Sequence, residues 1–161
     1  DYALWPAFVP VWLMFLGCFV SCAGSTGGGI KMVRMVLLVK QARRELVRII
    51  HPRVVNPVSL GRKALPSTVM TAVLGFMLIY GAITVGLTML MLLSGLDLVT
   101  GFSAVIATVN NIGPGLGAVG PASNFGVLSE FQLVVLTFAM MLGRLELLSV
   151  LVLFVGAFWR R

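Results

Sequence analysis

Residues 98–113 read LVTGFSAVIATVNNIG, an apolar stretch that runs directly into two asparagines and a glycine. A helix over the twelve residues 98–109 would reach only about 18 Å, well short of the roughly 30 Å hydrocarbon core of a membrane. The following part, TVNNIGPGLGAVGPASNFG at 108–126, holds five glycines and two prolines, which prevent the helix from continuing. The pattern predicts a short helix followed by an unwound segment.

The composition places this segment in a membrane protein. Of 161 residues, 59% are hydrophobic and 11% are charged, and the mean hydropathy is +1.06. A soluble domain of this size needs a far more polar surface, so we expect an all-α membrane protein. Unwound backbone at membrane depth is tolerated only where protein buries it or water meets it. The segment after Val109 is therefore expected to line a water-filled path, although an ordinary external loop is the alternative.

Three longer apolar segments can cross the membrane: 3–23, 69–93 and 131–159. The chain starts at Asp1 with no signal-peptide pattern before its first apolar segment, and we expect it to be a fragment of a longer protein.

The charges decide whether residues 98–109 cross as well. Nine of the twelve Lys and Arg residues lie within 31–63, and two close the chain. Cationic loops stay in the cytoplasm, and only three crossings put both basic clusters on that side, with the acids Asp1, Asp97 and Glu130 outside. The short helix should therefore enter from outside and return, with Asp97 as its N-cap.

A glycine-rich stretch, CAGSTGGGIKMVR at 22–34, has the look of a phosphate-binding loop but not its spacing. Ile30 displaces the lysine, Met32 stands where a hydroxyl should follow, and a membrane segment takes the place of the required strand. Three consecutive glycines cost a helix about 3 kcal/mol relative to alanine. We expect the first helix to break here, near the membrane interior, with an amphipathic basic helix resuming at about Ile30. A flexible helix end at the cytoplasmic surface is the alternative.

Arg144 lies near the middle of the third apolar segment. An arginine at the bilayer midplane costs at least ~2.5 kcal/mol, so it usually faces a cavity or a partner. Glu146 is two residues away and points to a different helix face, which makes a local ion pair a poor alternative. In a cation pore, Arg144 could donate hydrogen bonds to a broken helix and raise the barrier to cations.

Other functional classes find little support. The single histidine, His51, has no acidic or cysteine companion in the basic loop, and no nucleophile–base pair is visible, so we expect no enzyme. Cys18 and Cys22 are interpreted as packing residues. The confinement of the positive charge to one loop and the C-terminus argues against nucleic acid, with anionic lipid headgroups as a possible secondary partner of the loop.

Three stretches together, AGSTGGGIK, TVNNIGPGLG and GRLELL, carry a family resemblance. In this order and spacing they resemble the C-terminal part of the TrkH/TrkG potassium-uptake proteins of the Trk/Ktr/HKT cation transporter superfamily, and HPRVVNPVSLGRKALP at 51–66 is similar to the family's cytoplasmic link. The resemblance implies a potassium-channel-like fold of membrane-helix/pore-helix/membrane-helix repeats with re-entrant filter loops. The chain would hold the second membrane helix of repeat three with its glycine-rich loop (1–30), a basic helix and linker (31–66), and the whole fourth repeat (67–161), with helix 68–94, pore helix 97–109, filter 110–116 and helix 129–159.

The resemblance also implies the site residues. Backbone carbonyls would bind potassium at Asn110, Asn111, Ile112 and Gly113. An intramembrane gating loop beneath the filter would consist of Gly24, Ser25, Thr26, Gly27, Gly28 and Gly29. Arg144 would be the pore-lining arginine of the last repeat.

The same resemblance implies the setting. Potassium would be the transported ion, with no cofactor, in the inner (plasma) membrane, and residues 31–66 and the C-terminus would be cytoplasmic. The partners would be membrane lipid, the remaining repeats, a second copy in a homodimer, and a cytoplasmic nucleotide-binding subunit similar to TrkA. The alternative function is an ion-coupled secondary transporter with discontinuous helices, in which Arg144 holds the carboxylate of a small substrate.

Overall fold

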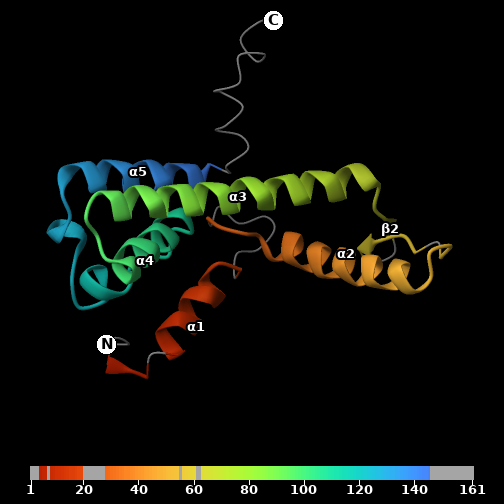
Figure 1. The fold of residues 1–161 in the computed structure, drawn as a ribbon, viewed down its shortest axis with the longest axis horizontal. Helices are drawn as coiled ribbons and strands as arrows, with labels where there is room; N and C mark the ends of the chain where they lie inside the picture. Colours follow the sequence, from red (N-terminus) through yellow and green to blue (C-terminus); the bar gives the residue numbers. More distant parts are fainter. Residues whose placement is uncertain (1–3, 7, 20–27, 55, 61–62, 146–161) are drawn as a thin grey trace, which may run out of the picture.

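The computed structural model describes residues 4–6, 8–19, 28–54, 56–60 and 63–145 and is mostly helical (Figure 1). The α-helices are α1 (Phe8–Gly17), α2 (Met32–Ile50), α3 (Ser67–Leu93), α4 (Leu98–Val109) and α5 (Glu130–Arg144). Two short 3-10 helices, η2 (Gly117–Val119) and η3 (Phe125–Val127), follow α4, and the strands β1 (Ser59–Leu60) and β2 (Lys63–Ala64) precede α3.

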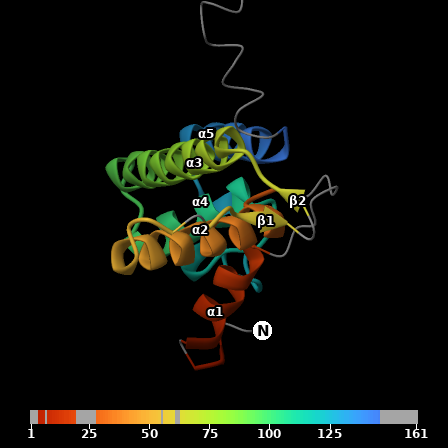
Figure 2. The same cartoon turned by 90° about the vertical axis from the view of Figure 1, so that its right-hand side faces the viewer.

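Helix α3 is the longest element, and the other helices are arranged around it. Within the described residues it alone is long and apolar enough to cross a membrane, whereas α1 and α4 are shorter apolar helices. Figure 1 shows α4 and α5 beside its C-terminal half and α2 beside its N-terminal half, and Figure 2 shows α1 projecting away from α3 and α5. On the α2 side, the Arg34 guanidinium lies 3.9 Å from the centre of the Phe76 ring, a favourable cation–π arrangement.

Side-chain caps hold the beginnings of α4 and α5 next to the end of α3. The backbone N–H of Thr100 donates to the Asp97 carboxylate at 3.0 Å, so the predicted N-cap is confirmed. Ser129 and Gln132 form a capping box at the start of α5. The Gln132 amide also donates to the Ser94 hydroxyl at 2.8 Å. These bonds join three helix ends at one end of the molecule.

The first helix is shorter than predicted. Instead of continuing through 3–23 and breaking at the glycines, α1 ends at Gly17, and turn hydrogen bonds follow at Cys18. The side chain of Ile112 packs closely on this last helical residue, and an added Cβ at Gly17 would lie 2.7 Å from it. At the other end of the chain, α5 is described up to Arg144, and the predicted continuation to residue 159 lies outside the described residues.

The link at 51–66 contains a short β-hairpin that the all-α expectation did not include, while the described chain as a whole is mostly helical. Strands β1 and β2 pair antiparallel there, with Ser59 opposite Ala64. Two long-range contacts explain why the link is held in this form. The Lys40 ammonium donates to the Ser59 carbonyl at 2.7 Å, and Val58 is buried in a small cluster with Leu37, Met70 and Val73.

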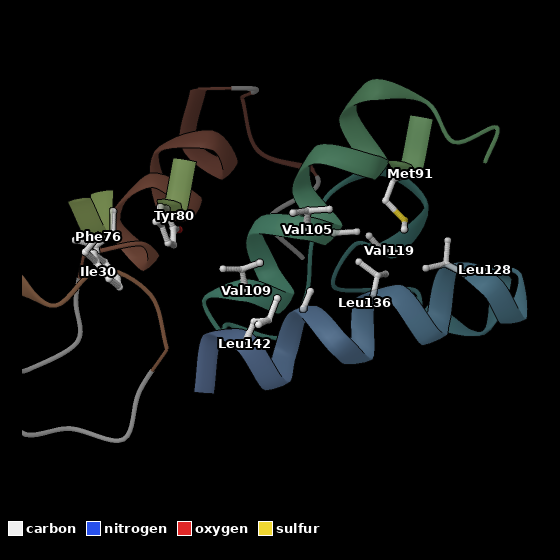
Figure 3. Close-up of a cluster of buried hydrophobic side chains, with 12 residues drawn as sticks. Ile30, Phe76, Tyr80, Met91, Val105, Val109, Val119, Leu128, Leu136 and Leu142 are labelled. Carbon is white, nitrogen blue, oxygen red and sulfur yellow. The ribbon is translucent and has the colours of Figure 1, made fainter. Parts of the chain in front are cut away.

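The main core lies where α4 meets α3 and α5. Met91, Val105, Val109 and Leu136 are fully or almost fully buried, and Figure 3 shows Val105 and Val109 of α4 facing Leu136 and Leu142 of α5. Burying a side chain of this size contributes about 1.5–3 kcal/mol. Helix α4 is therefore the best-buried helix of the described chain, and its position fixes the residues that follow it.

The Asp97 cap generates a pH prediction. The Thr100 hydroxyl and backbone N–H donate to the carboxylate and hold the pKa of Asp97 below its ordinary value of 3.8. A lowered folded-state pKa means that this stabilisation is complete above pH 3.8 and is lost as the pH falls through the folded-state pKa. We expect Asp97→Ala to lower the thermal unfolding midpoint at neutral pH.

Asp97→Asn is the matched control, because asparagine caps a helix about as well as aspartate and does not titrate. It should keep the neutral-pH midpoint and lose the cap's share of the acid sensitivity. Equal midpoints for all three proteins at neutral pH would show that the cap contributes nothing measurable.

Candidate functional site: the end of the short helix

Helix α4 ends in a hydrogen-bonded turn made by the two predicted filter asparagines. The Ile112 N–H donates to the Ala107 carbonyl at 2.9 Å and the Asn111 N–H to the Thr108 carbonyl at 3.1 Å, the pair of bonds found in a Schellman motif. Asn111 has a positive φ of 54°, which asparagine tolerates better than most residues. The residues predicted as the filter therefore begin in the turn that ends α4, with Asn110 as its C-cap.

The chain then runs back along α4. The Leu116 N–H donates to the Ser103 hydroxyl at 2.8 Å, and the Ala118 N–H donates to the Thr100 hydroxyl at 3.2 Å. Two hydroxyls of α4 thus satisfy backbone groups of the following segment, in which only the 3-10 turn η2 is regular. These bonds hold the segment along α4 as far as the level of Thr100.

The backbone carbonyls at the turn have no hydrogen-bond donor among the described residues, and that of Asn110 packs against Gly28. Residues 111–114 are exposed, and among the hydrogen bonds between described residues none is accepted by the backbone carbonyls of residues 110–113. The C-terminus of a helix also carries a partial negative charge of about half an elementary charge. Both features favour a cation near Asn110, and no acidic residue of the described chain lies at this end of α4.

One hydrogen bond shows how far α4 extends along α3. The Tyr80 hydroxyl donates to the Asn110 side-chain carbonyl at 3.0 Å. Tyr80 is the middle residue of the 27-residue α3. The helix α4 thus begins level with one end of α3 and ends level with its centre.

Glycines allow other elements to approach this turn closely. An added Cβ at Gly28 would lie 2.9 Å from the backbone carbonyl oxygen of Asn110 and 2.7 Å from the side-chain amide nitrogen of Asn111. An added Cβ at Gly143 of α5 would collide with the Val109 carbonyl oxygen. Together with Gly17 of α1, these positions surround the end of α4 with backbone, at distances that no larger residue permits.

Part of the predicted gating loop is brought to the site. Gly28 and Gly29 lie against Asn110, whereas Gly24, Ser25, Thr26 and Gly27 lie outside the described residues. The Ile30 N–H donates to the Cys18 carbonyl at 3.1 Å, so the two ends of the intervening segment meet beside the turn. Of the residues proposed from the sequence, this end of the loop and the filter residues come together.

Arg144 is placed close to the same point by its neighbour. Gly143 contacts the Val109 carbonyl, and Arg144 follows it in the last turn of α5 with an exposed side chain. Glu146, the alternative partner of this arginine, lies outside the described residues.

Sequence reasoning did not identify three residues that shape the site: Tyr80, Thr100 and Ser103. Each was visible as a polar residue in an otherwise apolar segment, and Thr100 and Ser103 share a helix face because they are three apart. His51 is exposed at the end of α2, and the described residues contain no cluster of His, Cys, Asp and Glu that could hold a metal.

Comparison with known proteins identifies the family. The family model described as TrkH, cation transport protein, matches residues 1–161. The chain belongs to the TrkH cation transport protein family. The resemblance found in the three motifs is thereby confirmed.

The relatives show how much of a TrkH protein this chain represents. It is 45% identical over 159 residues to the Trk system potassium uptake protein TrkH of Vibrio parahaemolyticus, covering 99% of this chain and 32% of the relative. It is 41% identical over 160 residues to TrkG of Escherichia coli K12, covering 99% and 33%. The crystal structure of the potassium transporter TrkH from Vibrio parahaemolyticus matches with a TM-score of 0.90 at 45% identity, covering 99% of this chain and 34% of that one. The chain spans about a third of the length of these relatives.

The contact between Gly143 and Val109 yields a stability prediction. Gly143→Ala should push α5 away from the end of α4 and cost about 1–3 kcal/mol, as overpacking of a close contact does. Chemical or thermal unfolding of the purified protein measures the loss.

Gly75→Ala on α3 is the matched control, since nothing lies within 4 Å of an added Cβ there. Alanine in a helix is favoured over glycine by up to about 1 kcal/mol, so this variant should be neutral or slightly stabilised. Equal unfolding stabilities of the Gly143→Ala and Gly75→Ala variants would contradict the close approach of α5 to the end of α4.

Proposed function

We propose that this chain supplies one filter strand and part of the gate of a potassium-uptake pore in the inner (plasma) membrane. The observation that carries the proposal is the end of α4. This short helix stops level with the middle of α3, and the exposed backbone after it offers carbonyls in the field of the helix C-terminus. The names of the relatives, which are potassium uptake proteins, support the choice of ion.

The potassium ligands in this proposal are the backbone carbonyls of Asn110, Asn111, Ile112 and Gly113. Neutral carbonyl oxygens can replace the hydration shell of a monovalent cation as it passes. Gly113 has a φ of 113°, a conformation open to glycine that turns the strand from the helix-terminating bend into the returning segment.

In the membrane, α3 would cross completely and α4 would enter from outside to mid-depth. Residues 31–66 and the C-terminus would then be cytoplasmic. Exposed apolar side chains such as Leu78 (74% exposed) and Leu93 (88%) would contact lipid or other parts of the protein. An apolar cavity of about 360 Å³ between α1 and α4, lined by Phe15, Phe102 and Ile106 among others, would receive the remaining repeats.

The proposal extends to the assembly. The relatives are named as parts of a Trk system, a name that fits a multi-component transporter. We therefore include a homodimer of the full-length protein and a cytoplasmic nucleotide-binding subunit similar to TrkA. The basic helix α2 and the link after it provide the surface that would face this subunit.

Substitution of Arg144 tests the proposed pore. In the full-length protein that carries this chain, reconstituted in liposomes, Arg144→Ala should raise potassium flux by about tenfold, because a cation at the inner end of the filter repels potassium. Arg144→Lys is the control that keeps the charge and should stay near the unaltered flux. Absence of potassium flux in the unaltered protein, or loss of transport of an organic anion in the variant, would contradict the pore and favour the secondary transporter.

The glycine-rich loop tests the gate. Removing residues 24–29 from the full-length protein should leave a pore that leaks potassium under closing conditions, because Gly28 and Gly29, which pack against Asn110, would be gone with the rest of the predicted gating loop. Replacing only Ser25 and Thr26 by glycine keeps the length and should keep the pore closed. Normal closure after the deletion would show that these glycines only end the first helix and do not gate the pore.

A further inference from the structure

The side chain of Asn110 is buried where several segments meet, and it faces away from the exposed backbone. Asn110 is 5% exposed and Tyr80 is 9% exposed. The Asn110 amide nitrogen donates to the Ile106 carbonyl at 2.8 Å and lies 3.6 Å from the Cys18 sulfur. Its carbonyl oxygen accepts from the Tyr80 hydroxyl at 3.0 Å.

These partners fix the orientation of the amide. The Ile106 oxygen can only accept, so the nitrogen of Asn110 must face it and the oxygen must face Tyr80. Both ends of the amide are therefore used for contacts inside the protein. Asn110 can offer an ion only its backbone carbonyl, and its side chain determines where that carbonyl stands.

The end of the glycine-rich segment presses on the same amide. Gly29 has a φ of +82°, and a Cβ added there would collide with the Asn110 side-chain oxygen. Gly28 lies against the Asn110 backbone carbonyl. Both Tyr80 of α3 and the backbone of Gly29 thus contact the side-chain oxygen of Asn110.

We infer that Tyr80 is a specificity-determining positioning residue, whose hydroxyl holds Asn110, and through it the first carbonyls of the filter, at the distance that favours potassium. The inference rests on the proposed function. Selectivity among monovalent cations depends on the spacing and mobility of coordinating carbonyls, and supporting residues that lock such groups determine how well the geometry is kept. Without the hydroxyl, the Asn110 oxygen has no donor in a buried place, and the amide and its backbone shift.

A purely structural role for Tyr80 makes a different prediction. It would lower the unfolding midpoint of the variant and leave the ratio of potassium to sodium flux unchanged. The flux ratio therefore separates positioning of the filter from general packing.

The experiment uses Tyr80→Phe in the full-length protein in liposomes, with potassium and sodium fluxes measured in parallel. We expect the potassium-to-sodium ratio to fall by about fivefold, the factor associated with one net hydrogen bond between neutral groups. Thr88→Val is the matched control, because Thr88 is a buried hydroxyl of the same helix that donates to the Thr84 carbonyl, away from Asn110. Its ratio should stay within about twofold of the unaltered protein.

A second variant acts on Asn110 from a different segment of the chain. Gly29→Ala should displace the amide and also lower the ratio, and the double variant with Tyr80→Phe should show less than the product of the two effects, because both act through one residue. If Tyr80→Phe does not fold, Gly29→Ala decides the question, with Gly75→Ala as its control.

The outcomes separate the inference from the function on which it rests. No potassium flux in the unaltered protein would overturn both. Selective potassium flux that Tyr80→Phe and Gly29→Ala leave unchanged would overturn the role of Tyr80 and leave the proposed pore standing.

Discussion

The rest of the structure depends on the place where α4 stops. A twelve-residue apolar helix is too short to cross a membrane, so its end and the chain that follows must find polar partners at depth. The Schellman bonds from Asn111 and Ile112 satisfy carbonyls of the last turn, and the hydroxyls of Thr100 and Ser103 satisfy the returning backbone. Within the described residues, the backbone carbonyls of residues 110–113 accept no hydrogen bond, and these carbonyls form the candidate site.

Local chemistry made α4 and its surroundings predictable from the sequence. The Asp97 cap and the abrupt change from apolar residues to asparagine, glycine and proline act over a few residues, so the helix and its end could be located without a structure. The same holds for α3, which the apolar segment 69–93 indicated and which the structure has at Ser67–Leu93. The assignment of these elements to a particular repeat, and the ligand role of the carbonyls, stay predictions.

Contacts between residues far apart in the chain could not be predicted from the sequence. Gly17 at the end of α1 contacts Ile112, and Asn110 contacts Tyr80 and Gly29, all far apart in the chain. Glycine illustrates the difference. The run at 27–29 was interpreted from its helix-breaking tendency, whereas in the structure Gly28, Gly29 and Gly143 are places where backbone packs against the turn. Composition alone does not separate these two uses, because both need the absence of a side chain.

Close approach and polar satisfaction together explain why neutral groups dominate the interior of the site. Charged groups would be costly at this depth, whereas an amide between a hydroxyl and a backbone carbonyl is satisfied without net charge. In the proposed pore, the field that a cation meets would come from oriented dipoles, namely the end of α4 and the carbonyls after it. Dipoles held by packing cannot reorient around the ion as water molecules would, so a small displacement of Asn110 would change that field. For this reason the proposed ion site includes the uncharged contacts behind the carbonyls.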